Sequence, residues 1–328
     1  MDAGDLSATC QSGRRRVTLG AAPPPVSGWI ILDKPVELGS TQAVAAVKRN
    51  LREAGFNMKL KGGLKVGHGG TLDPLAEGVL PIALGEATKL TGRLLDASKI
   101  YRFTIRFGEE TDTLDAEGPV VATSACRPTR EQVEAVLARF TGAIEQVPPA
   151  YSALKVDGRR AYDRARAGEA VELAGRAVTI YALDLSGWDD GLATLTAHVS
   201  KGTYIRSLAR DIAHALGSVG HVTYLRRIKA GPFREEQAIS LDKLNEIGKG
   251  ARLEDLLLPL EAGLDDIPAL PLDPDSVQAA RQGRVISGLP HADGLYCATN
   301  GNIPVALMEL TGGTAKVVRG FNLPDVAE

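Results

Sequence analysis

The chain of 328 residues contains 44% hydrophobic and 24% charged residues, as is typical of a globular protein, and its net charge of −2 does not by itself favour a nucleic-acid partner. No apolar run approaches the roughly 20 residues that a membrane-spanning helix needs, and the N-terminus lacks the apolar stretch of a signal peptide, so we expect a cytoplasmic protein. Three widely spaced cysteines and five histidines form neither a disulfide framework nor a zinc motif, so we expect no metal.

Charge is distributed unevenly along the chain. Residues 251–328 contain 5 Lys and Arg against 11 Asp and Glu, whereas residues 1–250 carry a local net charge of +4. A polyanion is therefore expected to bind mainly to the first part of the chain.

Order is predicted to begin near Gly28. Residues 1–26 are polar and run into Ala-Ala-Pro-Pro-Pro, which predicts a flexible extension. The apolar run 29–32 predicts a buried strand, and Ser40 or Thr41 is suited to cap a helix that continues to about Ala54. A Gly- and Lys-rich loop without acidic residues follows at 55–66.

The remaining residues up to 250 mix helices and strands without a regular strand-helix-strand alternation. This mixture favours an α+β domain over residues 27–250, with a largely antiparallel sheet flanked by helices. We expect helices at 87–95, 129–140 and 205–216, a helical connection at 240–258, and strands at 79–84, 99–108, 177–188, 193–200 and 223–229.

Residues 251–328 are predicted to form a second, smaller domain. A Pro- and Gly-rich stretch precedes a short helix near 276–282, and three short strands are expected at 295–299, 303–310 and 315–318. Short strands separated by turns indicate a small β-barrel.

The densest chemical signal is the segment 67–78, Gly-His-Gly-Gly-Thr-Leu-Asp-Pro-Leu-Ala-Glu-Gly. Its glycines permit a close backbone approach to a ligand, and Pro74 biases Asp73 towards an extended conformation. From these residues alone, Asp73 could be a nucleophile, a general base, a metal ligand or a helix cap, and a plain turn is the commoner outcome. A phosphate-binding loop and a dinucleotide fingerprint are both excluded by the spacing.

Residues 68–90 (HGGTLDPLAEGVLPIALGEATKL) closely resemble the catalytic segment of the TruB family of tRNA pseudouridine synthases. Further blocks occur in the same order as in that family, and together they cover roughly residues 27–235, with a weaker likeness in the tail. These blocks are 28–35 (GWIILDKP), 99–102 (KIYR), 108–115 (GEETDTLD), 146–155 (QVPPAYSALK), 200–207 (SKGTYIRS) and 221–227 (HVTYLRR).

The resemblance implies a pseudouridine synthase fold followed by a PUA-like RNA-binding domain at 251–328. It implies an isomerase that flips the T-loop uridine at position 55 of tRNA out of its stack and converts it to pseudouridine, with Asp73 as covalent nucleophile. The reaction involves no redox step, so no cofactor is expected. We further expect a monomer that acts on the T-stem-loop without a guide RNA. The tail is more acidic than a strong phosphate binder would be. We therefore expect it to help position tRNA modestly, or only to support the fold.

By resemblance, Arg206 pairs with Asp73, and Tyr101 stacks on the target base and assists loss of its C5 proton. Tyr204 and Leu225 match positions that line the uridine pocket. Without the resemblance, Arg206 would be taken for a surface arginine and Tyr101 for a core tyrosine.

The other residues that the resemblance assigns surround this set. Lys34 and Pro35 are expected to shape the pocket wall, and His68 to enter the space that the flipped bases leave. The loop at 55–66 is longer than is usual in the family, and its lysines are either phosphate contacts or a solvated face. The lysines concerned are Lys59, Lys61 and Lys65.

Three other functions would each use part of the same sequence pattern. An RNA chaperone would need the basic loop but not Asp73 with Arg206. A related synthase could act on rRNA or depend on a guide RNA. A retaining glycosidase needs a second carboxylate a few ångströms away, and only Glu77 stands near Asp73 in the sequence.

Overall fold

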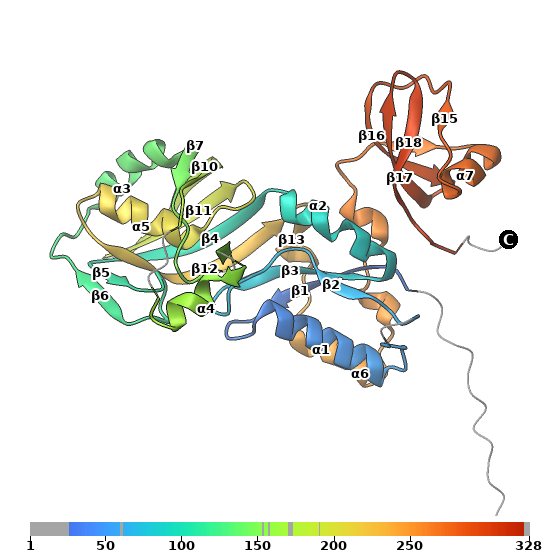
Figure 1. Cartoon of the computed structure of the whole chain (residues 1–328). Coiled ribbons are helices and arrows are strands. Elements are labelled where there is room, and N and C mark those ends of the chain that lie inside the picture. Colours follow the sequence, from blue (N-terminus) through green and yellow to red (C-terminus); the bar gives the residue numbers. More distant parts are fainter. Residues whose placement is uncertain are drawn as a thin grey trace, which may run out of the picture.

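The computed structural model describes residues 26–59, 62–152, 154–156, 158–169, 173–189 and 191–324. Its elements form one large sheet flanked by helices and one small sheet near the C-terminus (Figure 1). The extension predicted at 1–26 lies outside the described residues except for Val26, which packs against buried apolar residues of the large domain. None of the helices in the described ranges has the length and apolarity needed to cross a membrane.

The large sheet has nine strands, and its main path runs in the order β1-β3-β12-β4-β11-β10-β7. All neighbours along this path are antiparallel except β12 and β3, so the predicted mixed, largely antiparallel sheet is confirmed. Its strands are β1 (Gly28–Lys34), β2 (Val66–His68), β3 (Glu77–Leu84), β4 (Lys99–Phe107), β7 (Gly142–Gln146), β10 (Arg176–Asp189), β11 (Leu192–Val199), β12 (Gly220–Ala230) and β13 (Phe233–Arg234).

Two pairs of helices cover different parts of this sheet (Figure 1). Their apolar side chains are buried against it. Helices α1 (Ser40–Glu53) and α6 (Leu241–Gly248) cover the β1–β3 side, where Val47 and Leu244 are fully buried. Helices α3 (Arg130–Leu137) and α5 (Ile205–Ala215) cover the strands from β4 to β10. The apolar surface buried under α1 and α6 and under α3 and α5 thus holds in place the strands that carry the candidate site residues.

Three predicted helices differ from the structure. The helix expected at 129–140 is α3 followed by the 3₁₀ helix η2 (Ala138–Phe140). The helix expected at 87–95 is a 3₁₀ helix η1 (Gly85–Leu90) followed by α2 (Thr91–Asp96). The helical connection expected at 240–258 is wrong beyond Gly248, because Gly250 adopts a φ of 103° that no α-helix accepts. Residues 249–258 contain one short 3₁₀ helix, η4 (Leu253–Leu256), in place of the expected α-helix.

Two small hairpins and a short helix complete the large domain. One hairpin pairs β5 (Glu109–Thr111) with β6 (Val120–Thr123), and the other pairs β8 (Lys155–Val156) with β9 (Arg159–Arg160). Helix α4 (Ala161–Arg166) directly follows the second hairpin. Both hairpins are separate from the nine-stranded sheet.

The small sheet has five strands in the order β14-β16-β17-β18-β15. Helix α7 (Pro274–Arg281) packs on it through Val277 and Ala280. The domain is β-rich as predicted, but among its described strands β14 and β15 each pair with a single neighbour, so the hydrogen bonds do not close a barrel. The strands are β14 (Ala269–Pro271), β15 (Ile286–Ser287), β16 (Gly294–Asn300), β17 (Ile303–Thr311) and β18 (Thr314–Gly320).

The chain passes from the large to the small sheet through residues that pack on β1. The indole of Trp29 donates a 3.1 Å hydrogen bond to the carbonyl of Leu260, within the 3₁₀ helix η5 (Leu260–Gly263). The same apolar cluster continues into the small sheet with Leu307 and Phe321. The domain division at residue 250 stays a prediction, and residues 253–263 lie against the large sheet.

Candidate active site

A cavity of about 340 Å³ opens where the loop before β3 meets β4, β12 and the start of α5. The neighbouring positions of β3, β12 and β4 in the sheet bring these distant segments together. Of the residues predicted for the site, the cavity is lined by Asp73, Tyr101, Tyr204, Arg206 and Leu225.

The loop that carries Asp73 is fixed by its own backbone contacts. Ser40, at the start of α1, accepts a 2.8 Å bond from the amide of Leu72 and donates a 2.9 Å bond to its carbonyl. The carbonyl of Pro74 accepts the amide of Glu37 at 2.9 Å. Leu72 is buried, whereas the Asp73 side chain is 43% exposed at the cavity. The carboxylate is therefore accessible while the backbone on either side of it is anchored.

Glycine is required where this loop enters β3. Gly78 adopts a φ of 100°, and a Cβ there would lie 2.3 Å from the carbonyl oxygen of Arg227 on β12. A side chain would thus push apart the two parallel strands that frame the loop. This explains the final glycine of the segment 67–78.

Arg206 lies at the first turn of α5 and forms an ion pair with Asp73, with 2.8 Å between Nη2 and Oδ2. Its side chain is only 6% exposed, which excludes the alternative of an ordinary surface arginine. Nη1 donates to the carbonyl of Thr113 at 2.9 Å, and Nη2 donates to the carbonyl of Tyr151 at 3.0 Å. The guanidinium is thus held in one orientation and holds the carboxylate in turn.

Asp115 is a second carboxylate partner of Arg206 that the sequence did not single out. Its Oδ2 lies 3.2 Å from Nη1 of Arg206, and its Oδ1 accepts bonds from the Thr113 hydroxyl at 2.6 Å and the Glu117 amide at 3.0 Å. Burial, followed by the nearby charge of Asp115, raises the pKa of Glu117. The only signal in the sequence was the position of Asp115 at the end of the block 108–115, which marks a resemblance without a role.

Tyr101 and Leu225 face the cavity from adjacent strands, β4 and β12. Both are half-buried and pack against the apolar clusters on each side of the site. Tyr204 precedes α5, and its amide and carbonyl both bind the side chain of Gln146, at 2.7 Å and 3.1 Å. Burial raises the pKa of the Tyr204 phenol. Gln146 is another residue whose positioning contact the sequence did not indicate.

Lys34 and Pro35 do not line this cavity, in contrast to the predicted role in its wall. Lys34 is fully buried behind the loop, and its ammonium donates to the carbonyls of Pro35, Leu38 and Pro74 at 2.9, 2.6 and 3.3 Å. Burial lowers the pKa of Lys34 to about 8, although the charge of Asp73 acts in the opposite direction. Pro35 is exposed. Lys34 therefore holds the backbone of the loop that carries Asp73 from its buried side.

His68 and the predicted phosphate contacts lie outside the cavity lining. His68 ends β2 and is half-buried, and its Nδ1 has no hydrogen-bond partner in the described residues. Burial, followed by the charge of Arg227, lowers the pKa of His68. Lys59 and Lys65 are exposed, and Lys61 lies outside the described residues.

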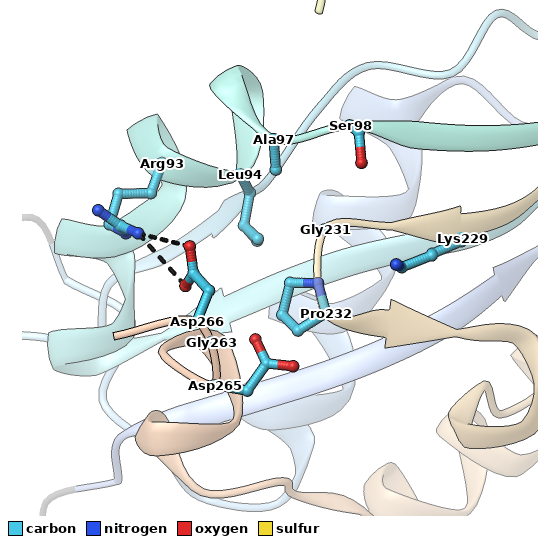
Figure 2. Close-up of a pocket in the computed structure, with 10 residues that line it drawn as sticks. All are labelled: Arg93, Leu94, Ala97, Ser98, Lys229, Gly231, Pro232, Gly263, Asp265 and Asp266. Carbon is cyan, nitrogen blue, oxygen red and sulfur yellow. Dashed lines mark hydrogen bonds and ion pairs between the residues drawn. The ribbon is translucent and has the colours of Figure 1, made fainter. Parts of the chain in front are cut away.

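A second cavity of about 310 Å³ lies between α2, the turn after β12 and residues 263–266 (Figure 2). Arg93 at its rim is paired with Asp266 at 3.0 Å, and Lys229 and Asp265 also face it. None of the predicted site residues lines this cavity. The first cavity is therefore the candidate active site.

Comparisons with known proteins agree with this geometry. Residues 56–205 match the family described as TruB family pseudouridylate synthase (N terminal domain), and residues 206–265 match the tRNA pseudouridylate synthase B C-terminal domain. The chain is similar to proteins named tRNA pseudouridine synthase B from Novosphingobium aromaticivorans and Zymomonas mobilis. The first is 69% identical over 92% of this chain and 100% of that protein, and the second is 60% identical over 90% and 96%.

Solved structures with the same fold are also similar to the chain. One is titled a structure of an H/ACA RNP bound to a substrate RNA containing 2′-deoxyuridine; it has a TM-score of 0.67 and 26% identity over 90% of this chain and 85% of that one. Another is a Cbf5–Nop10–Gar1 complex, with a TM-score of 0.67 and 26% identity over 89% and 84%. The predicted fold is thereby confirmed.

Proposed function

Because the chain belongs to the TruB family of pseudouridylate synthases, we propose that it acts on the T-loop uridine at position 55 of tRNA, with Asp73 as its nucleophile. The protein is an isomerase that converts uridine in tRNA to pseudouridine. The observation that carries the finer proposal is the ion pair of Asp73 with Arg206 at a cavity lined by Tyr101 and Leu225.

The reaction breaks the bond between uracil N1 and ribose C1′ and joins C5 to C1′. A nucleophile that holds one fragment covalently divides this change into easier steps. Asp73 supplies an exposed carboxylate on an anchored loop, and Arg206 orients it through the 2.8 Å contact. Asp115 holds the other side of the guanidinium, so Arg206 cannot rotate away from the nucleophile without losing a second ion pair.

The cavity supplies the surroundings that the detached base needs. Tyr101 offers an aromatic face for stacking and a phenol for removal of the C5 proton. Leu225 and Tyr204 enclose the base from β12 and the start of α5, and enclosure keeps the base in place between bond cleavage and bond formation. His68 is proposed to enter the stack when the uridine is flipped out, and it ends β2 shortly before the loop that carries Asp73.

We propose that the substrate is recognised through the T-stem-loop alone, by a monomer in the cytoplasm and without a guide RNA. Exposed Lys59 and Lys65 are proposed to contact RNA phosphates, together with Lys61 of the same loop. The β-rich domain after residue 250 is proposed to be PUA-like and, because it is acidic, to position tRNA only modestly. No cofactor takes part in this scheme.

The test compares wild-type protein with Asp73→Asn on an isolated T-stem-loop RNA, with pseudouridine mapped by chemical labelling. We expect modification by the wild type, and RNA binding without modification by the variant. Turnover by Asp73→Asn would overturn the nucleophile assignment, and an RNA chaperone would leave the RNA unmodified in both cases. A wild type that modifies this RNA only when a guide RNA is added, or that prefers rRNA hairpins, would overturn the substrate proposal. Release of free uracil would indicate a glycosidase.

A further inference from the structure

Arg227 on β12 is a buried cation of the active-site cavity that the proposed mechanism does not use. It is 1% exposed and lines the cavity two residues after Leu225. Its guanidinium donates to three carbonyls, those of Val79 at 2.8 Å, Gly70 at 3.1 Å and Thr71 at 3.3 Å. Among the described residues, no carboxylate oxygen lies within 4.0 Å of its nitrogens. Its positive charge therefore has hydrogen-bond acceptors but no counter-ion.

Two arginines close to Arg227 are balanced by carboxylates. Arg206 has Asp73 and Asp115. Arg226, the neighbour of Arg227 on β12, forms ion pairs at 3.0–3.2 Å. Because a buried charge without a counter-ion is costly, the lack of one at Arg227 calls for a physical reason. The carboxylates around Arg226 are those of Asp33, Glu77 and Glu235.

Lys99 adds a second positive charge to the same part of the cavity. It is 7% exposed, and its ammonium donates at 2.6–2.8 Å to three carbonyls near the end of α2. No carboxylate of the described residues is within ion-pair distance of it either. Lys99 lies two residues before Tyr101 on β4, and Tyr101 is the register partner of Arg227 on β12. One cation thus lies near Tyr101, the residue proposed to face the base, along β4, and the other lies next to it across the sheet on β12.

The charges of these two groups influence each other. Burial is the main cause that lowers the pKa of Lys99 to about 8, and Arg227 lowers it further. Arg227 also acts in the same direction on Lys34 and His68. An anion that enters the cavity would therefore relieve repulsion as well as gain attraction.

We propose that Arg227, assisted by Lys99, stabilises the uracil anion that forms in this cavity during isomerisation, an inference that rests on the proposed function. The base of the substrate is neutral. If Asp73 attacks C1′, the N1–C1′ electron pair leaves on N1; if it attacks C6, the added pair resides on the ring. In the first route C5 of the detached ring then bonds to C1′ while the C1′–O bond to Asp73 breaks and its electron pair returns to the carboxylate. In the second route the N1–C1′ bond breaks after the addition, C5 bonds to C1′, and the C6–O bond then breaks as Asp73 leaves as a carboxylate. In both routes the ring loses the proton at C5 and gains one at N1, so the product base is neutral.

This charge pattern favours the intermediate over the bound substrate. Interactions that strengthen only as charge develops accelerate the chemical step without tightening substrate binding. A cation already fixed by three backbone carbonyls needs no rearrangement when the base becomes negative. Arg227 is thus expected to act on the rate of the reaction and not on the affinity for RNA.

The experiment measures single-turnover loss of uridine or 5-fluorouridine from otherwise identical T-stem-loop RNAs. Fluorine withdraws electrons and stabilises the detached base as an anion, so its loss depends less on a protein cation. We expect Arg227→Met to slow the loss of uridine about 100-fold, to slow the loss of 5-fluorouridine clearly less, and to leave the Kd for RNA unchanged. Arg227→Lys, which keeps the charge, is expected to lie much closer to wild type.

Arg226→Met is the matched control, since it removes the same kind of side chain from the neighbouring position of β12. Any decrease in the single-turnover rate of this variant should be the same for uridine and 5-fluorouridine. If Arg227→Met slowed the reaction equally for uridine and 5-fluorouridine, Arg227 would only hold the loop in place. If the Kd for RNA rose while the rate stayed normal, Arg227 would be a phosphate contact. Either result overturns the inference. If Arg227→Met fails to fold, Lys99→Met is compared on the two RNAs in the same way. A wild type that leaves uridine unchanged would instead refute the proposed function.

Discussion

Replacement of Asp115 by Asn tests whether the orientation of Arg206 matters for catalysis. In the wild type, Oδ1 of Asp115 accepts hydrogen bonds from the Thr113 hydroxyl at 2.6 Å and from the Glu117 amide at 3.0 Å. The substitution keeps an oxygen that can accept both bonds. It replaces the oxygen 3.2 Å from Nη1 of Arg206 by an amide that donates and so faces another donor. The perturbation is therefore confined to one side of the guanidinium.

The expected loss of stability in Asp115→Asn depends on how deeply the ion pair is buried and on which partners Arg206 keeps. Both side chains are below 10% exposed, and breaking such a pair costs about 3–5 kcal/mol. Arg206 retains Asp73 and two carbonyls, so we expect the lower end, a loss of about 3 kcal/mol in the free energy of unfolding. A shift of the guanidinium by about 1 Å would slow the chemical step about 100-fold.

Urea unfolding and single-turnover pseudouridine formation measure the two effects separately. Thr113→Val is the control, because it removes the bonds of the Thr113 hydroxyl to Oδ1 and to the carbonyl of Asp115, at 2.6 and 3.3 Å, and leaves both ion pairs of Arg206 in place. It is expected to cost about 1 kcal/mol with little change in rate. A folded Asp115→Asn protein with a rate within threefold of wild type would refute the view that two carboxylates are needed to orient Arg206.

Two further predictions follow from the lysines. Changing both Lys59 and Lys65 to Gln should weaken tRNA binding and lower the slope of log K against log salt by about one unit per lysine, as measured in a salt titration; a salt-independent loss would contradict phosphate contacts. The second concerns pH. Lys34 has a pKa of about 8 in the folded protein and 10.5 as a free side chain, so the unfolded chain binds more protons between these values and the free energy of unfolding rises with pH there. Between pH 7.5 and 10, the free energy of unfolding measured in urea should therefore rise by up to about 3 kcal/mol less in Lys34→Met than in the wild type. If the free energy of unfolding of wild type and variant changed equally with pH, Lys34 would not titrate in this way.

The sequence predicted those parts of the structure that depend on local patterns. The apolar run 29–32 located β1, and the possible capping residues Ser40 and Thr41 located the start of α1. The helix predicted through 240–258 failed because apolar spacing persists beyond the point where Gly250 takes a backbone conformation that ends helices. Periodicity reports which side chains are apolar and does not report the φ of a glycine.

The candidate site was predicted only as far as the resemblance named individual residues. Asp73 and Arg206 are 133 positions apart, and no local pattern states that the order of β3, β12 and β4 brings them to 2.8 Å. Asp115 and Gln146 escaped notice because each acts by holding another residue. Arg227 escaped notice because a basic residue on a strand usually points to solvent, and only the structure shows it buried among carbonyls.

The carbonyl contacts explain how an irregular loop presents a nucleophile stiffly. Arg227 binds the carbonyls of Gly70 and Thr71, Ser40 binds both backbone groups of Leu72, and Lys34 binds the carbonyl of Pro74. Side chains from three elements thus hold the backbone on both sides of Asp73, while its carboxylate remains exposed at the cavity. Buried cations suit this task because a loop offers free carbonyls, and an ammonium or guanidinium binds several at once. The positive charge that fixes the loop then also lies where the reaction generates negative charge, so support of the nucleophile and stabilisation of the detached base come from the same buried groups.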